Sequence, residues 1–359
     1  MGEKRKKLVI ISGKLVKGGS ERVISILAGH FAGTHDVSIV TVLSEKVEYE
    51  IPDTVNIINL SRRDRLRLLK APLWLLGLMK VFISLKKENS VLISFVARIN
   101  TLTLLANLFT GIPVIISERN DPAMDKRGPL TKMLVNLLYP RAQCIVFQSE
   151  YAMSLFKESI RRKGVVIHNP IGPFDQYKMS TKKKSFVTVG RLSEQKNQTM
   201  LITAFEKVHL LHPEYELHIY GEGPLKERLE ALCLELGVSE SVFIKKPIDN
   251  IHEELASHGI FVLSSDYEGQ SNALLEAMEL GLPCISTDLP GHRGIVTDEN
   301  AILVDSGNLV QLADAMIGLV EDQQKRERIS EKASADMKKL EKYKILEKWN
   351  EIMEALYEE

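Results

Sequence analysis

Short apolar segments alternate with amphipathic helical segments along almost the whole chain. The apolar segments of the first half are residues 8–12, 37–43, 91–95, 114–117 and 144–148. Those of the second half are residues 185–189, 216–220, 242–244, 260–263, 283–286 and 301–304. Strands that are apolar along their whole length and separated by helices are typical of parallel sheets covered on both faces. The pattern therefore predicts an α/β protein.

The length and one interruption of this pattern predict two domains. A chain of 359 residues is too long for one ordinary core and fits two α/β domains of similar size. The series is interrupted at residues 169–184, NPIGPFDQYKMSTKKK, where Pro, Gly and polar residues show no periodicity. We therefore predict doubly wound, Rossmann-like domains at residues 1–172 and 173–340. Residues 341–359 are predicted to form a helix that packs back on the first domain.

Composition excludes several classes of protein. No apolar run approaches the roughly 20 residues that span a bilayer. The three cysteines are scattered and lack metal-ligand spacing, which predicts a reduced, cytosolic protein without a structural metal. Residues 1–175 carry 26 Lys and Arg against 15 Asp and Glu, whereas the remaining residues carry 21 against 32. Either the basic half meets an anionic partner or the two halves attract each other.

Two glycine-containing segments follow strands. In the first, Gly18 and Gly19 let the backbone approach a ligand, and Ser20 is predicted to cap the next helix, whose N–H groups suit a diphosphate. A glycine pair there also forms ordinary tight turns, and the dinucleotide fingerprint G-x-G-x-x-G is absent. In the second, a strand runs into Gly190, and the cations that follow, Arg191 and Lys196, would hold a leaving diphosphate or be solvated surface charges.

A third segment, SSDYEGQSNALLEAMELGLP, carries two glutamates eight positions apart. We predict that Gly269, Gln270, Ser271 and Asn272 open a helix, with Glu268 near its start and Glu276 about two turns further on. Two turns separate the carboxylates by roughly 12 Å, too far for the paired carboxylates of a retaining glycosidase. The two carboxylates suit a ligand with two hydroxyl-bearing parts, such as a sugar and a ribose. The alternative is an amphipathic helix with two solvated glutamates.

Taken in order, these segments resemble family 4 of the glycosyltransferases, also called glycosyl transferases group 1. The resemblance rests on GGSERV, VFQSEY, VIHNPI, VGRLSEQKN, LHIYGEGPLKERL, EGQSNALLE, AMELGLPCISTD and DLPGHRGIV, and it covers essentially the whole chain. It implies the GT-B fold, in which two Rossmann-like domains face each other across a cleft. It also implies a retaining, metal-independent transferase that moves a hexose or N-acetylhexosamine from a nucleotide diphosphate sugar, UDP-sugar being favoured, to a glycan. No cofactor and no nucleic-acid partner are expected.

The resemblance also implies residue roles. Arg191 and Lys196 would neutralise the departing diphosphate, which Gly18 and Gly19 would approach from the other domain. Glu268 would contact the donor sugar and Glu276 the ribose. The donor would also be lined by Gly190, Gly269, Gln270, Ser271 and Asn272.

One segment departs from the family pattern. Where many members carry a histidine that faces the donor sugar, this chain reads ISERNDP, with Arg119 at about that position. The variant resembles a subset that acts on lipid-linked or surface glycans, so Glu118, Arg119 and Asn120 are candidate site residues. A structural pair between Arg119 and Asp121 is the alternative. His168 and His292 are expected to be structural or peripheral.

The acceptor and its location are suggested by residues 61–88, a basic, amphipathic segment that Pro72 is expected to divide. Such a segment can lie on an anionic membrane surface, or it can be a buried helix with a solvated basic flank. We expect an oligosaccharide or polyprenyl-diphosphate-linked acceptor in bacterial surface glycan synthesis, and a cytoplasmic protein, peripheral on the inner membrane face. A 2-epimerase of UDP-sugars and a non-catalytic sugar-binding protein are the alternative functions.

Overall fold

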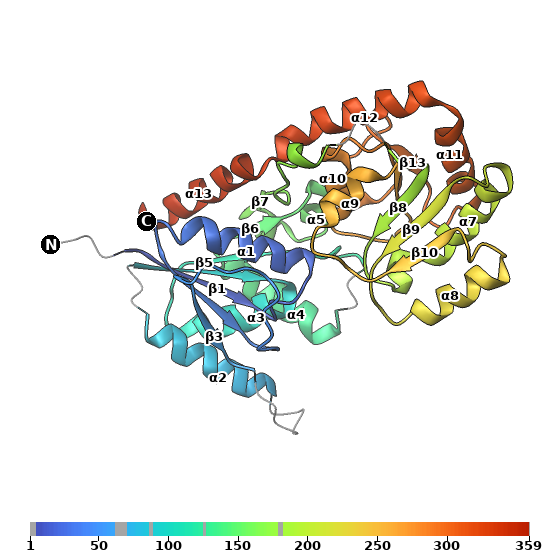
Figure 1. Ribbon diagram of the computed structural model, residues 1–359. Coiled ribbons are helices and arrows are strands. Elements are labelled where there is room, and N and C mark those ends of the chain that lie inside the picture. Colours follow the sequence, from blue (N-terminus) through green and yellow to red (C-terminus); the bar gives the residue numbers. More distant parts are fainter. Residues whose placement is uncertain (1–4, 62–69, 86–88, 125–126, 179–181, 359) are drawn as a thin grey trace. The chain divides into compact units, whose positions relative to one another are not determined.

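The structure is a computed structural model that describes residues 5–61, 70–85, 89–124, 127–178 and 182–358. The chain divides into two compact units (Figure 1), one formed by Met1–Pro170 with Tyr343–Glu359 and the other by Ile171–Lys342. Each unit is a parallel α/β sheet with helices on its faces, and each is described separately below. The predicted fold class is therefore confirmed.

The first unit contains a seven-stranded parallel sheet in the order β3-β2-β1-β4-β5-β6-β7. Its strands are β1 (Lys7–Ser12), β2 (Asp36–Thr41), β3 (Asn56–Asn59), β4 (Ser90–Phe95), β5 (Val114–Ser117), β6 (Cys144–Phe147) and β7 (Gly164–Val166). The sequence predicted the five inner strands and missed the edge strands β3 and β7. Neither edge strand is fully buried, so neither carries the continuous apolar run that identified the others.

The helices of the first unit are α1 (Gly19–Phe31), α2 (Lys70–Ile83), α3 (Ala97–Ala106), α4 (Pro129–Leu138), α5 (Glu150–Ser154) and α6 (Glu158–Arg161), with short 3-10 turns η3 (Asn107–Phe109) and η4 (Tyr139–Arg141). Pro72 lies in the first turn of α2, where a helix tolerates proline. The apolar face of α2 is part of the core, because Trp74, Leu78 and Phe82 are buried. Residues 62–69 and 86–88 of the predicted amphipathic segment lie outside the described residues.

The last helix, α13 (Lys342–Glu358), packs on the first unit although it lies at the other end of the sequence. Trp349 is 1% exposed, and its ring centroid lies 6.4 Å from that of Phe95 at the end of β4. His30 of α1 is hydrogen-bonded to Asn350 at 2.8 Å. The core of the first unit is therefore completed by a helix that begins 176 positions after the last strand of its sheet.

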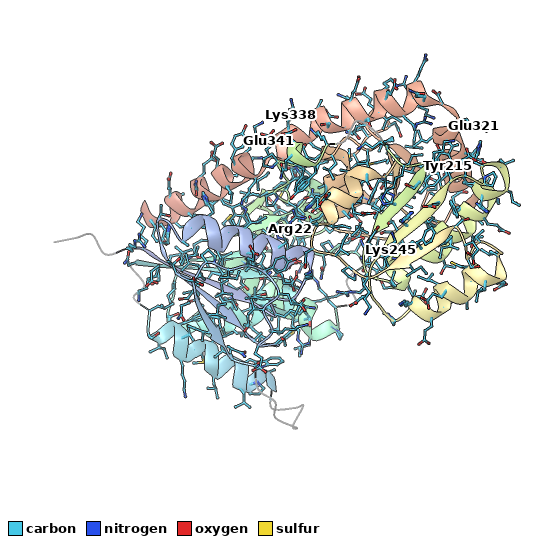
Figure 2. All side chains as sticks on the ribbon, in the orientation of Figure 1. Arg22, Tyr215, Lys245, Glu321, Lys338 and Glu341 are labelled. Carbon is cyan, nitrogen blue, oxygen red and sulfur yellow. The ribbon has the colours of Figure 1, made fainter. Side chains whose placement is uncertain are left out.

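The second unit contains a six-stranded parallel sheet in the order β10-β9-β8-β11-β12-β13. Its strands are β8 (Ser185–Val189), β9 (Glu216–Tyr220), β10 (Val242–Lys245), β11 (Ile260–Leu263), β12 (Cys284–Thr287) and β13 (Ile302–Val304). All six were predicted to within one residue at each end. Tyr215, labelled in Figure 2, comes directly before β9 and packs its ring 5.6 Å from that of Phe186 in the core.

The helices of the second unit are α7 (Gln198–Leu211), α8 (Lys226–Glu235), α9 (Ile251–Ser257), α10 (Asn272–Glu279), α11 (Leu309–Glu321) and α12 (Gln323–Met337), with 3-10 turns η5 (Asp175–Tyr177), η6 (Glu194–Lys196), η7 (Pro290–His292) and η8 (Lys338–Leu340). In the first sheet the strand order reverses between β1 and β4, and in the second sheet it reverses between β8 and β11. Open α/β sheets bind ligands at the carboxyl ends of the strands around such a reversal. The loops after β8 and β11 meet this condition in the second unit.

Candidate functional site

Gly190 and Lys196 lie against each other in the loop between β8 and α7. A methyl group at Gly190 would stand 3.0 Å from Cε and 3.3 Å from Cδ of Lys196. The lysine side chain therefore lies across the glycine, in space that a larger residue would occupy. The sequence predicted both residues at this loop, and the structure brings them into contact.

Lys196 forms an ion pair with Glu268, which comes from the loop after β11 and is 72 positions away in the sequence. Both side chains are largely buried, with exposed fractions of 18% and 11%. The carboxylate of Glu268 also accepts hydrogen bonds from Ser265 Oγ at 3.0 Å and from Gln195 Nε2 at 3.5 Å. The carboxylate and the ammonium are thereby held in one place beside the glycine.

Further hydrogen bonds join the two loops that carry this pair. Asn197 is left-handed at φ 46°, caps α7 with its side chain, and donates to Asp266 at 2.8 Å. Ser264 Oγ donates to the carbonyl of Lys196 at 2.9 Å. Gln195 Nε2 donates to the carbonyl of Tyr267 at 2.9 Å. Because these bonds fix both loops, the Lys196–Glu268 pair is pre-organised.

Arg191 follows Gly190 directly in the loop after β8. Its side chain is exposed, and its guanidinium makes no hydrogen bond or ion pair with any residue the structure describes. The loop after β9, which contains Gly221 and Gly223, packs closely against the backbone beside Arg191. A methyl group at Gly221 would stand 1.9 Å from the carbonyl oxygen of Gly190. Arg191 is thus a cation available to an anionic ligand.

Glu268 and Glu276 do not share a helix, contrary to the prediction. The helix α10 begins at Asn272, so only Glu276 is helical, and Glu268 lies in the preceding loop. The calculated separation of two turns therefore does not apply. Glu276 is buried and is hydrogen-bonded to His252 at 3.1 Å. The ring of His252 stacks on Phe174 with centroids 4.0 Å apart, so residues near the domain boundary support the orientation of Glu276.

The segment between the two glutamates contacts His292, which was expected to be structural or peripheral and is buried in a structural position. The backbone N–H of Ser271 donates to Nε2 of His292 at 3.1 Å. Burial lowers the pKa of His292 to about 4, although the nearby Glu268 carboxylate opposes the shift. A methyl group at Gly291 would stand 1.9 Å from the carbonyl oxygen of Gly269. The DLPGH segment therefore supports the backbone of Gly269, Gln270 and Ser271, and Gln270 and Ser271 are buried, whereas Asn272 is half-buried.

In the first unit, Gly18 and Gly19 lie at the start of α1 as predicted, but Ser20 does not cap that helix. The N-cap is Gly18, in an extended conformation and without a side-chain cap. The hydroxyl of Tyr49 holds Gly18 instead, accepting from its N–H at 3.0 Å and donating to its carbonyl at 2.8 Å. This contact joins α1 to the loop after β2.

The ISERND segment divides into two environments. Glu118 is 1% exposed, forms an ion pair with Arg127 at 2.6 Å and accepts a hydrogen bond from Tyr139. Burial and the Glu118 carboxylate raise the pKa of Tyr139 well above its usual value. Arg119 is 6% exposed and donates through Nη1 to Asn169 at 2.7 Å, and burial lowers its pKa to about 9. Asn120 is exposed.

The alternative of an Arg119–Asp121 pair is not realised. Among the described residues no ion pair joins these two side chains, and Asp121 accepts from the backbone N–H of Ala123 at 2.9 Å instead. His168 is bonded to the carbonyl of Gln148 at 2.8 Å, in agreement with a structural role.

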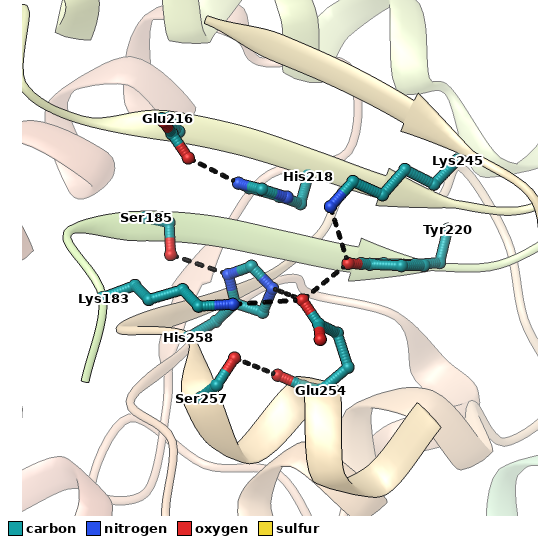
Figure 3. A network of polar contacts seen from close by, with 9 residues as sticks. All are labelled: Lys183, Ser185, Glu216, His218, Tyr220, Lys245, Glu254, Ser257 and His258. Carbon is teal, nitrogen blue, oxygen red and sulfur yellow. Dashed lines mark hydrogen bonds and ion pairs between the residues drawn. The ribbon is translucent and has the colours of Figure 1, made fainter. Parts of the chain in front are cut away.

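A second polar cluster contains none of the predicted site residues (Figure 3). His258 is fully buried, with Nδ1 2.7 Å from Ser185 Oγ and Nε2 3.2 Å from Glu254. Burial lowers the pKa of His258 to about 3. Glu254 also accepts from Tyr220 at 2.8 Å and from Lys183 at 3.2 Å. These contacts join α9 to the sheet, which gives the cluster a structural role.

Two statements about metal sites and membrane spans hold for the residues that the structure describes. Within them, no group of three or more His, Cys, Asp or Glu side chains is arranged to hold a metal ion. None of the described helices combines the length and the apolarity that crossing a membrane requires.

The chain is similar to known glycosyltransferases in sequence and in fold. Residues 174–336 match the family model described as glycosyl transferases group 1. An N-acetylgalactosamine-N,N'-diacetylbacillosaminyl-diphospho-undecaprenol 4-alpha-N-acetylgalactosaminyltransferase of Campylobacter jejuni is 28% identical over 94% of this chain and 97% of its own length. The amylovoran biosynthesis glycosyltransferase AmsD of Erwinia amylovora is 23% identical over 97% of this chain and 99% of its own.

Solved structures show the same fold. HepE of Anabaena in complex with UDP-glucose superposes with a TM-score of 0.82 at 16% identity, covering 98% of this chain and 100% of its own. The fold and the matched relatives define a glycosyltransferase of the GT-B class. Within that class, the family match is to glycosyl transferases group 1, over residues 174–336. The alternatives of an epimerase and of a non-catalytic sugar-binding protein are not favoured by these matches.

Proposed function

We propose that the protein is a retaining glycosyltransferase that transfers a hexose or N-acetylhexosamine from a UDP-sugar, without a metal ion, to a polyprenyl-diphosphate-linked glycan. The observation that carries the proposal is the Lys196–Glu268 pair beside Gly190. An ammonium has three N–H donors, so Lys196 can bind a diphosphate oxygen while it remains bonded to Glu268. The Glu268 carboxylate accepts a hydrogen bond from a sugar hydroxyl.

The second unit then supplies charge stabilisation where the reaction needs it. As the bond between the sugar and the diphosphate breaks, negative charge grows on the phosphate oxygens. Lys196 contributes a point charge, and Arg191 contributes a planar fork suited to two phosphate oxygens. Glu276, oriented by His252, accepts from the ribose hydroxyls. The acceptor hydroxyl attacks on the face that the diphosphate leaves and gives its proton to a phosphate oxygen, which retains the anomeric configuration.

The relatives support the acceptor part of the proposal. The Campylobacter relative is named for an undecaprenyl-diphosphate acceptor, and the Erwinia relative for the biosynthesis of a polysaccharide. A lipid-linked acceptor places the enzyme at the inner face of the cytoplasmic membrane. In the first unit α4 exposes Leu130, Met133 and Leu137 on one side, near the exposed Lys132. Apolar residues with basic neighbours favour an anionic lipid surface.

The donor assignment is tested by thermal unfolding with UDP, GDP, ADP and a panel of UDP-sugars in the presence of EDTA. A ligand of the native state at a hundredfold excess over its Kd adds about 2.7 kcal/mol of stability. We expect UDP and one UDP-sugar to raise the melting temperature, and Lys196→Ala to reduce the increase clearly. Absence of any nucleotide effect in the wild-type protein would refute the donor site.

The reaction itself is tested with the identified donor and a synthetic polyprenyl-diphosphate glycan. We expect the NMR coupling constants of the new anomeric centre to match those of the donor. An inverted product would refute retention, and UDP-sugar turnover without acceptor would indicate an epimerase. For the membrane surface, we expect cosedimentation with anionic but not zwitterionic vesicles at low salt, reduced in Leu137→Ser. Equal binding to both vesicle types would contradict an electrostatic attraction between the protein and anionic lipids.

A further inference from the structure

Arg119 is held rigidly at the carboxyl end of β5 in the first unit. Its Nη1 donates to Asn169 Oδ1 at 2.7 Å, and its guanidinium carbon lies 5.3 Å from the centroid of the Phe95 ring. The side chain is only 6% exposed. One corner and one face of the guanidinium are thus fixed by neighbours.

The opposite edge of the same guanidinium lacks partners. Nε and Nη2 are buried and make no hydrogen bond within the described part of the chain. These two N–H groups lie side by side and form the fork that binds two oxygens of one carboxylate or phosphate. The adjacent acid Glu118 is bonded to Arg127 and Tyr139 instead. A buried cation with two unsatisfied donors is strongly unfavourable for folding, which favours a functional reason for it.

The surroundings of Arg119 carry two further signs of a binding site. Gln148, at the end of β6, is 4% exposed, and its Oε1 is likewise without a hydrogen-bond partner among the described residues. Val96, directly after β4, adopts φ 71°, a conformation that is strained for a β-branched residue. All these residues follow strands at the carboxyl edge of the sheet, where α/β proteins bind ligands.

We propose that Arg119 is the centre of an oxyanion-binding site in the first unit, where Nε and Nη2 together bind two oxygens of a phosphate or carboxylate group of the acceptor. The assignment of this group to the acceptor rests on the proposed function, whereas the binding of an oxyanion does not. The two sources of such a group are the diphosphate of a lipid-linked acceptor and the carboxylate of an acidic sugar.

The competing explanation is that Arg119 serves the fold alone through Asn169 and Phe95. The two explanations predict different melting temperatures for Arg119→Met, which keeps the length of the side chain and removes the charge. If the charge of Arg119 serves a ligand, methionine should replace it with an unchanged or higher melting temperature, because Gln148 still donates to Asn169. If Arg119 serves the fold alone, Arg119→Met should lower the melting temperature. Arg119→Lys provides a second variant that keeps the charge and removes the fork.

The experiment measures binding of sodium pyrophosphate, glucuronate and uncharged glucose to the full chain by calorimetry. Arg98→Met is the matched control, because Arg98 is an exposed arginine of the same unit. Pyrophosphate bound by Arg191 and Lys196 in the second unit contributes equally to all variants. We expect wild type and the control to bind one of the two oxyanions, Arg119→Met to lose at least tenfold in affinity, and Arg119→Lys to lose less.

The anion that is lost identifies the source: pyrophosphate indicates a diphosphate, and glucuronate an acidic sugar. Unchanged oxyanion affinity in both Arg119 variants, or no oxyanion binding by the wild type, would overturn the inference. A lowered melting temperature in Arg119→Met together with full affinity in Arg119→Lys would equally show a structural arginine. Binding requires no sugar transfer, so a protein that binds UDP but no oxyanion through Arg119 refutes this inference and leaves the proposed function standing.

Discussion

The contact between Gly190 and Lys196 makes a quantitative prediction about the substitution Gly190→Ala. The added methyl group would lie 3.0 Å from Cε of Lys196, so the lysine must move by a few tenths of an ångström. The atom that yields is the end of a flexible side chain, so we expect a folding cost of about 1 kcal/mol or less. The reduced freedom of the unfolded chain returns about 0.4–1 kcal/mol, which leaves the stability almost unchanged.

In Gly190→Ala, the affinity for UDP should change more than the free energy of unfolding does. A hydrogen bond from an ammonium to a phosphate contributes about 1.5–3 kcal/mol, and a displaced lysine loses part of it. A loss of about 1 kcal/mol corresponds to a roughly fivefold higher Kd in Gly190→Ala. Lys196→Ala loses the whole interaction, about tenfold to a hundredfold in Kd. The assays are denaturant unfolding for stability and calorimetry with UDP and EDTA for affinity.

A second glycine provides the matched control. At Gly221 the methyl group would stand 1.9 Å from the carbonyl oxygen of Gly190, and only a backbone shift can relieve that overlap. We expect Gly221→Ala to lose more than about 3 kcal/mol of unfolding free energy. Wild-type UDP affinity in Gly190→Ala, or wild-type stability in Gly221→Ala, would show that these packing contacts do not control the site.

Two other predictions concern the core of each unit. The pKa of His258 is lowered to about 3 in the folded protein from an ordinary value of 6.5, so the unfolded state binds more protons between these values. Stability should therefore fall as the pH is lowered from about 6.5 towards 3, by up to roughly 1.4 kcal/mol per pH unit, and His258→Gln should flatten this dependence in denaturant titrations. Trp349→Ala removes a ring that is 1% exposed and should cost about 3–5 kcal/mol, whereas Tyr343→Ala, 57% exposed on the same helix, should cost less than about 0.5 kcal/mol. Equal effects of these two substitutions would contradict the packing of α13 on the first unit.

The inner strands could be predicted from the sequence because a strand buried on both faces must be apolar along its whole length. Segments 114–117, 185–189, 216–220 and 260–263 match β5, β8, β9 and β11 to the residue. The edge strands β3 and β7 are short and partly exposed, so their composition does not distinguish them from loops. Burial on two faces, and not strand propensity, was the informative signal.

The candidate site residues of the second unit were selected through their motifs, but their partners could not be predicted. No spacing rule connects Lys196 to Glu268 across 72 positions, or Glu276 to His252 across 24. The eight-residue spacing of the two glutamates even suggested a shared helix, because a spacing of about two turns does not show where a helix begins. Likewise the sequence offered Asp121 as a neighbour for Arg119, and the fold brought Asn169 to it instead.

The sequence by itself therefore determined two parallel α/β sheets and the loops that carry the candidate site residues, because local burial patterns and glycine positions are recorded in adjacent residues. Only the tertiary structure decided which charges are paired and which are left for a ligand. Lys196 is paired with Glu268 on a distant loop and Glu118 with Arg127 nine positions away, whereas two nitrogens of Arg119 have no partner within the described residues. Pairing depends on distances between strand ends that are set when the sheet assembles, and one-dimensional spacing does not contain them.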